Sequence, residues 1–177
     1  MAWEYVQNVL CRATFAGVTH LSDSAVQRAA EVKIVQQLAT ELGVALLPGG
    51  RIQIGGGGAY VQVDARSAHD DVIVEAYARQ GALKGAQLKK VGQDILKFAL
   101  LRRTAGWVDA RLILAFASAE AKESIRGWVA QAAEVFEVEF VVVDLPPEDR
   151  EQILAAQQRQ VMVNLSADEA DALADQG

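Results

Sequence analysis

The 177-residue sequence contains only one cysteine, three prolines and two histidines. A single cysteine, Cys11, excludes an internal disulfide and a cysteine-based zinc site, so we expect a reducing, cytoplasmic environment. The low proline content and the hydrophobic fraction of 51% argue against a disordered chain. No apolar run approaches the roughly 20 residues that cross a membrane, and the N-terminal MAWEYVQNVL lacks the basic-then-apolar order of a signal peptide. We therefore expect a cytoplasmic protein with no membrane partner.

The scarcity of histidine also bears on catalysis. His69 falls in a polar turn between two expected strands, and no serine or cysteine occupies a nucleophile-elbow motif. A mechanism based on a Ser–His or Cys–His pair is therefore not indicated.

The net charge of −6 is unevenly distributed along the chain. Residues 144–177 contain eight acidic residues and two arginines, and so carry all of the net charge. By contrast, the segment from Arg79 to Arg103 is basic and contains Asp94 as its only acidic residue. Such a segment can bind the phosphates of DNA whatever the global charge, or it can be an ordinary solvated helix face. The acidic C-terminal segment could cover a sheet edge, form a homodimer or bind a protein partner.

An amphipathic helix is expected in the first quarter of the chain. A capping box at Ser24 and Gln27 predicts its start, and Gly43 predicts its end after Leu42. Glu31 lies beside the apolar stripe, near the middle of the helix. The stripe is expected to consist of Ala25, Ala29, Val32, Val35, Leu38 and Leu42.

Short strands and turns are expected between this helix and the centre of the chain. Residues 44–47 and 51–54 have strand-like patterns, and the Pro-Gly-Gly of residues 48–50 predicts a turn between them. The four glycines at 55–58 are followed neither by Gly-Lys-Ser/Thr nor by a helix, so we expect a connection between strands there and no phosphate loop.

The remaining elements alternate between helix and strand. Helices are expected at 2–10, 86–103, 118–135 and 148–160, strands at 111–117, 138–145 and 161–165, and a last short helix from Ser166. The helix at 86–103 is expected to bury Leu88, Val91, Ile95, Leu96 and Ala99 and to carry a polar stripe elsewhere, formed by Gln87, Lys90, Asp94 and Lys97. The helix at 118–135 is expected to bury Ala121, Ile125, Trp128, Val129 and Ala132. No linker interrupts the chain, so we expect one domain over residues 1–177, with 146–177 as an acidic C-terminal extension.

Two short strands in the centre of the chain each carry one carboxylate. Apolar and polar residues alternate at 61–64 and 72–75, and the polar turn between them is short enough to make a β-hairpin. Asp64 and Glu75 can then lie on neighbouring strands and face the same side of the sheet. Because buried carboxylates are costly without a compensating charge, this pair predicts a cation site.

These residues resemble the PD-(D/E)XK nuclease superfamily. The resemblance lies in Asp64, in the triplet Glu75-Ala76-Tyr77, in the Gln/Lys-bearing helix that follows, and in the element order over about residues 24–117. It implies a restriction-endonuclease-like α/β fold, a three-layer α/β/α core with a mixed central sheet, and a metal-dependent nuclease that hydrolyses DNA phosphodiester bonds. Asp64 and Glu75 would hold Mg²⁺ or Mn²⁺, with the carbonyl of Ala76 as a third ligand and Glu31 as a further one.

One position departs from the family pattern. The family's lysine falls two residues after the second acid, where this sequence has Tyr77, and a phenol with a pKa near 10 supplies no fixed positive charge. Some members place the lysine on the following helix, where Lys84 and Lys90 are the candidates, with Gln87 between them. If neither reaches the site, the resemblance implies a catalytically inactive nuclease-fold module that binds DNA or a protein partner.

Overall fold

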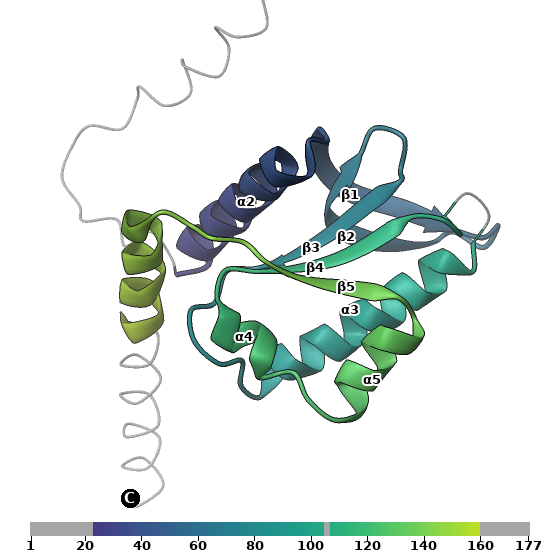
Figure 1. Ribbon diagram of the computed structural model, residues 1–177. Helices are drawn as coiled ribbons and strands as arrows, with labels where there is room; N and C mark the ends of the chain where they lie inside the picture. Colours follow the sequence, from purple (N-terminus) through teal and green to yellow (C-terminus); the bar gives the residue numbers. More distant parts are fainter. Residues whose placement is uncertain (1–22, 105–106, 160–177) are drawn as a thin grey trace, which may run out of the picture.

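The computed structural model describes residues 23–104 and 107–159 (Figure 1). In chain order, the elements are α2 (Asp23–Leu42), β1 (Leu46–Ile54), β2 (Ala59–Ser67), β3 (Val72–Tyr77), α3 (Ala86–Arg102), β4 (Arg111–Phe116), α4 (Ala119–Glu123), α5 (Trp128–Val135), β5 (Val138–Val142) and a helix at residues 147–159. They form an α/β protein in which helices flank a five-stranded mixed sheet.

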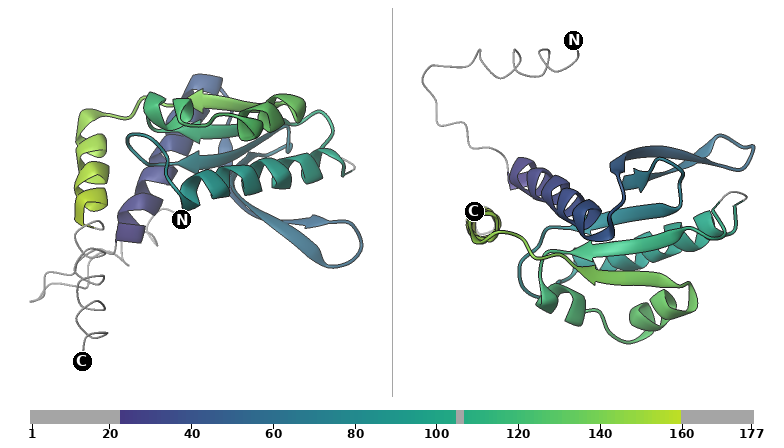
Figure 2. Two further views of the ribbon diagram at one scale, coloured as in Figure 1. Left: turned by 90° about the horizontal axis from the view of Figure 1, so that it is seen from below. Right: turned by 45° about the horizontal axis from the view of Figure 1, so that its top comes forward.

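The strands lie in the sheet in the order in which they occur in the chain. β1 and β2 are antiparallel, as are β2 and β3, whereas β4 runs parallel to β3 and β5 parallel to β4. Parallel neighbours need crossover connections, which α3 provides between β3 and β4, and α4 and α5 between β4 and β5. Helix α2 therefore lies over one face of the sheet, and α3, α4 and α5 lie over the other (Figures 1 and 2).

β3 and β4 form the centre of the sheet and are covered on both faces. Every residue of β3 is buried, and in β4 only Arg111 is exposed. Side chains alternate between a core under α3, which includes Ile73 and Leu112, and a core under α2, which includes Val74 and Ile113. The continuous apolar run of β4 is what a strand covered on both faces requires, and its prediction is confirmed.

The predicted turn at residues 48–50 is wrong, because these residues lie within β1. Pro48 has no backbone N–H, and it is tolerated in β1 because the outer side of this edge strand has no partner strand to bond. Gly49 passes so close to β2 that an added Cβ would lie 2.4 Å from the carbonyl oxygen of Val63. The chain reverses instead at the glycines of residues 55–58, which connect β1 and β2 as predicted.

The single helix predicted at 118–135 is also wrong: α4 and α5 are two short helices. Gly127 separates them at φ +64, a backbone conformation that glycine adopts easily and that ends an α-helix. The break removes the continuous apolar stripe on which the prediction depended, and Trp128, expected to face inward, is 77% exposed. β5 is likewise shorter than predicted and ends at Val142.

Helix α2 ends at Leu42 as predicted, and its packed face overlaps the predicted stripe in part: Leu38 is buried and Val35 and Leu42 pack against the core. Ala30, Ile34 and Leu38 are buried, whereas Val32, assigned to the apolar stripe, is 55% exposed. Small apolar residues occur on every side of this helix, so periodicity alone does not identify the packed face. Contacts with β3 and β4 select the face that carries Ile34.

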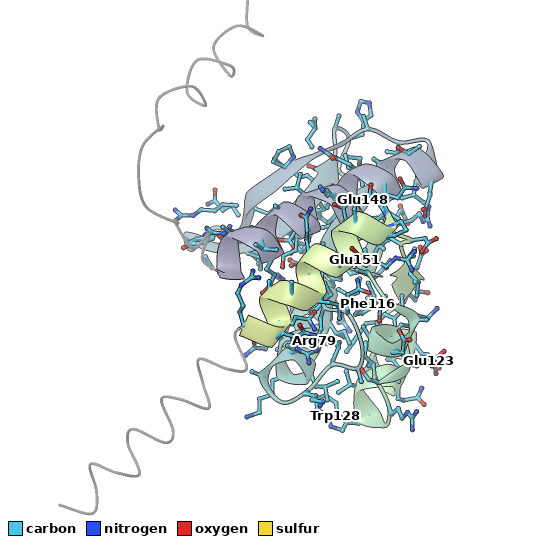
Figure 3. The ribbon with its side chains drawn as sticks, turned by 90° about the vertical axis from the view of Figure 1, so that its left-hand side faces the viewer. Arg79, Phe116, Glu123, Trp128, Glu148 and Glu151 are labelled. Atoms are coloured by element: carbon cyan, nitrogen blue, oxygen red, sulfur yellow. The ribbon has the colours of Figure 1, made fainter. Side chains whose placement is uncertain are left out.

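The helix at residues 147–159 packs beside α2, as Figure 3 shows with Glu148 and Glu151 along it. Lys33 of α2 forms an ion pair with the largely buried Asp149. Gln157 accepts a hydrogen bond from the Gln80 backbone N–H at 2.8 Å and donates one to the Gln80 carbonyl at 3.1 Å. This part of the acidic C-terminal segment therefore belongs to the packed structure.

The elements predicted at 2–10, at 161–165 and after Ser166 lie outside the described residues. Among the helices that are described, none combines the length and the apolar character needed to cross a membrane.

Candidate functional site

The polar stripe of α3 faces the sheet. Asp94 is 4% exposed, whereas Leu96, which was predicted to be buried, is 68% exposed. The prediction for Leu96 assumed that the charged stripe of this helix faces solvent, as charged stripes normally do, and it is wrong. Here Glu75 and Tyr77 of β3 provide partners for the charged side chains, and burying a charge becomes tolerable when it is paired and hydrogen-bonded.

Glu75, in the middle of β3, has two lysine partners on α3. The Lys97 ammonium donates a hydrogen bond to Glu75 Oε1 and another, of 2.8 Å, to the backbone carbonyl of Gln62. Lys90 Nζ lies 3.6 Å from Glu75 Oε2. Glu75 is 3% exposed, and charges interact more strongly in such an environment than in water. Both oxygens of this carboxylate are therefore held by cations from one helix.

Asp94 holds the two lysines in place. Its Oδ2 lies 2.7 Å from Lys90 Nζ, and its Oδ1 lies 2.9 Å from Lys97 Nζ. The Tyr77 hydroxyl also donates a hydrogen bond to Asp94 Oδ2, at 2.5 Å. Burial opposes ionisation of Asp94, but Lys90, the Tyr77 hydroxyl and Lys97 hold the pKa of Asp94 below its ordinary value. Burial and the charge of Asp94 raise the pKa of Tyr77, so this phenol is a hydrogen-bond donor and not an anion.

Asp64 lies where β2 separates from β3. Pairing between these strands is confined to Ala65 opposite Val74 and Arg66 opposite Ile73. One residue further, the Asp64 carboxylate accepts a hydrogen bond from the Ala76 backbone N–H at 2.8 Å through Oδ2. The Asp64 side chain thus accepts the β3 hydrogen bond that a backbone carbonyl of β2 would accept in a regular ladder. Because the N–H and C=O of one strand residue point to the same neighbour, the Ala76 carbonyl lies on this edge as well.

The cluster contains more negative than positive charge. Asp64, Glu75 and Asp94 are three carboxylates, and Lys90 and Lys97 are two ammonium groups. Burial, together with the charges of Asp64 and Asp94, raises the pKa of Glu75 to about 8 in spite of Lys97. Binding of a proton or of a cation would therefore relieve the excess negative charge next to Glu75.

Glu31 of α2 approaches the same region from the other side of β2. It lines a groove of about 540 Å³ between α2 and the first two strands, together with Arg28, Gln62 and Asp64. Burial raises the pKa of Glu31, the hydrogen bond from Gln27 lowers it, and the charge of Asp64 raises it further. Glu31 and Asp64 are thus close enough to interact, and both border an open groove.

The three catalytic candidates on or near α3, Lys84, Gln87 and Lys90, do not occupy one place. Lys90 contacts Glu75, but Lys84 and Gln87 contact each other, with the Lys84 backbone N–H 3.5 Å from Gln87 Oε1. Gln87 lines a separate small pocket with Arg79. Lys97 was not among the sequence-based candidates, although its spacing of three residues from Asp94 and seven from Lys90 places all three on one helix face.

The oxygen ligands of this site suit a hard divalent cation. No described group of three or more histidine, cysteine, aspartate or glutamate side chains is arranged to hold a metal ion, which leaves the pair Asp64 and Glu75 with the Ala76 carbonyl. Mg²⁺ prefers oxygen ligands and keeps several of its waters, so a protein can bind it through two carboxylates. The excess negative charge around Glu75 favours such a cation, but both oxygens of Glu75 contact ammonium groups, so a metal ion bound there would have to displace a lysine from Glu75.

The fold and the site define an α/β protein with a carboxylate–lysine cluster between its sheet and α3. Comparisons with protein-family models, curated proteins and solved structures found no match for the chain. Its function is therefore argued from the geometry of the site.

Proposed function

We propose that this chain is a metal-dependent nuclease with a restriction-endonuclease-like fold, which hydrolyses DNA phosphodiester bonds. The element order supports the proposal: helix α2, three antiparallel strands, helix α3, and then β4 parallel to β3. Two carboxylates lie on neighbouring strands near the point where β2 and β3 separate, and they are the two acids that the PD-(D/E)XK resemblance implies as metal ligands.

The position of the Lys90 ammonium carries the proposal. Its Nζ lies 4.6 Å from the centre of the Tyr77 ring and 3.6 Å from Glu75 Oε2. A positive charge from α3 thus lies beside the side chain that replaces the family's lysine. Burial lowers the pKa of Lys90, but Asp94 and Glu75 raise it overall, so the ammonium stays charged. A charge held in this way can stabilise a phosphate as negative charge develops on it during hydrolysis.

Each residue of the cluster has a separate role in this proposal. Asp64, Glu75 and the Ala76 carbonyl would hold Mg²⁺ or Mn²⁺. When bound, the metal would neutralise charge in the transition state and lower the pKa of the attacking water. Lys90 would contact the phosphate, while Asp94 orients Lys90 and keeps it charged. Lys97 stays paired with Glu75 and limits the repulsion between Glu75 and Asp64.

A catalytically inactive module that binds DNA or a protein partner is the second candidate. Two observations favour it: Tyr77 takes the place of the family's lysine, and both oxygens of Glu75 already contact ammonium groups. In that case the cluster is structural and Lys90 and Lys97 take the place of a metal ion. DNA affinity through the basic residues of α3 would then fall with salt concentration, without any cleavage.

Cleavage of labelled single-stranded and double-stranded DNA, with Mg²⁺, with Mn²⁺ and with chelator, tests the proposal. Asp64→Asn should abolish metal-dependent cleavage, and Lys90→Met should reduce its rate by roughly 100- to 1000-fold, the cost of removing one transition-state donor. Lys84→Met and Lys89→Met are matched controls, since both lysines are exposed like Lys90 but neither pairs with Glu75 or Asp94, and they should retain the rate within a few fold. Wild-type protein that binds DNA but cleaves nothing with either metal would establish the inactive module. Cleavage that survives Asp64→Asn would refute the assigned site.

A further inference from the structure

The hairpin formed by β1 and β2 extends beyond the part of the sheet that pairs with β3 (Figure 2). Its two faces differ. Ile52 is buried and Val61 packs against the core under α3. Cross-strand pairs on the other face join Arg51 to Gln62 and Gln53 to Tyr60, and all four of these residues are exposed. The hairpin therefore presents a polar face with one aromatic ring on it.

Tyr60 is arranged as a platform on this face. The Arg51 guanidinium lies over its ring, 4.4 Å from the ring centre, in the diagonal cross-strand position. Tyr60 nevertheless remains 52% exposed. A cation that covers one side of a ring fixes the orientation of the ring, and the exposed remainder can stack on a planar group.

The fold of the hairpin requires glycine at only two of the four glycine positions at its tip. Gly55 and Gly58 have φ values of +61 and +76, which explains glycine at these two positions. Gly56 and Gly57 have no such φ, and an added Cβ at either would meet nothing within 4 Å. Neither backbone conformation nor packing therefore explains these two glycines. Without side chains at these two positions, the tip of the hairpin stays uncovered.

The polar face leads into the candidate site. Gln62 follows Tyr60 on the same face of β2, and it lines the open groove together with Asp64 and Glu31. Four strand residues span at most about 13 Å, so the Cα atoms of Tyr60 and Asp64 lie within that distance of each other. About four stacked nucleotides cover the same length, at 3.4 Å per nucleotide.

We propose that the polar face of the β1–β2 hairpin binds an unpaired nucleotide of single-stranded DNA, which stacks on Tyr60, and that the strand continues into the groove beside Asp64. Bases inside a duplex are already stacked on their neighbours, so a ring on an exposed face selects unpaired bases. The Arg51 charge and the Gln53 and Gln62 amides suit the sugar–phosphate backbone next to the stacked base. This inference rests on the proposed function and adds a substrate class, DNA with a single-stranded segment.

The test measures binding in chelator, where no cleavage occurs, by fluorescence anisotropy of a 12-nucleotide single strand, a blunt duplex and a duplex with a single-stranded tail. Loss of one base-stacking ring should weaken binding of the single strand and of the tailed duplex by roughly 5- to 100-fold in Tyr60→Ala, with the blunt duplex unchanged. Tyr60→Phe, which keeps the ring, should bind like wild type. Gly57→Leu should weaken the same two ligands, since it fills the open tip without strain.

Trp128→Ala is the matched control, because Trp128 is an aromatic residue with even greater exposure on α5, and it should leave all three affinities unchanged. An equal loss for the blunt duplex in Tyr60→Ala, or no loss at all, would overturn the inference. Wild-type protein that binds none of the three DNAs would overturn it too. Cleavage assays separate it from the proposed function: cleavage with no role for Tyr60 refutes the hairpin site alone, and Tyr60-dependent binding without cleavage refutes the nuclease alone.

Discussion

Glu75→Gln should stabilise the protein at alkaline pH, although it removes a carboxylate with two lysine partners. Burial, Asp64 and Asp94 raise the pKa of Glu75 from 4.5 to about 8. The folded protein thus binds the Glu75 proton more tightly than the unfolded chain does. Its free energy of unfolding falls as pH rises from about 4.5 to about 8, and it is lowest once the carboxyl is ionised in both states.

The size of this effect follows from the pKa. The difference between 4.5 and about 8 corresponds to roughly 5 kcal/mol, at 1.36 kcal/mol per pKa unit, and this is an upper limit because the lysines can adjust. Glutamine keeps the shape of glutamate without its charge, so Glu75→Gln avoids the free-energy cost of burying an ionised carboxylate next to Asp64 and Asp94. Asp64 and Asp94 then balance the charges of Lys90 and Lys97. We expect the variant to exceed wild type by several kcal/mol at pH 8.5 and to approach it near pH 5.

Chemical denaturation at pH 5, 7 and 8.5 in chelator measures these values, and the same series with millimolar Mg²⁺ tests the metal site. The metal should stabilise wild type, increasingly as pH approaches 8, because it binds the ionised carboxylate, and it should not stabilise Glu75→Gln. Glu139→Gln is the control: Glu139 pairs with Arg111 at the surface, and the variant should lose at most about 1 kcal/mol, with no trend between pH 5 and 8.5. A Glu75→Gln protein less stable than wild type at every pH would contradict this prediction, since the two ion pairs of Glu75 would then outweigh the cost of burying its charge.

Three further variants test the fold and the cluster. Tyr77→Phe removes the 2.5 Å hydrogen bond to Asp94 and should lower the free energy of unfolding by about 1–3 kcal/mol. Any cleavage rate should stay nearly unchanged, and a large loss of rate at equal stability would show that the hydroxyl takes part in cleavage. Gly49→Ala should destabilise by about 1–3 kcal/mol or more in the same denaturation assay, because its Cβ would lie 2.4 Å from the Val63 carbonyl oxygen. Gly56→Ala, where a Cβ would meet nothing within 4 Å, should be neutral, and equal losses at the two glycines would show that their packing does not differ as described.

Local sequence patterns predicted several elements because each depends on neighbouring residues. Alternation around a short polar turn predicted the hairpin of β2 and β3, and the apolar run of β4 predicted a strand covered on both faces. Asp64 and Glu75 were likewise expected on neighbouring strands, and the structure places them there at the point of strand separation. Their catalytic and metal-binding roles stay predictions.

Patterns failed where two distant segments decide the outcome. The Pro-Gly-Gly of residues 48–50 has the composition of a turn, but it lies in a strand because β2 passes within contact of Gly49. The helix break at Gly127 had a local signal, since a glycine inside a helical pattern weakens the prediction of a helix, but the apolar pattern on both sides did not show that Trp128 turns to solvent. In α2, apolar residues lie on all sides of the helix, so contacts with the sheet decide which face is packed, and that face carries Ile34.

The cluster shows the same division most clearly. Local spacing is enough to place Lys90, Asp94 and Lys97 on one face of a helix, because a residue and those three, four and seven positions on lie together on an α-helix. The same holds for Glu75 and Tyr77, which are two residues apart on one face of a strand. That these two faces meet depends on the packing of α3 against the sheet. Charged residues are buried only when partners compensate the loss of water, and those partners lie 15 to 22 positions away in the chain.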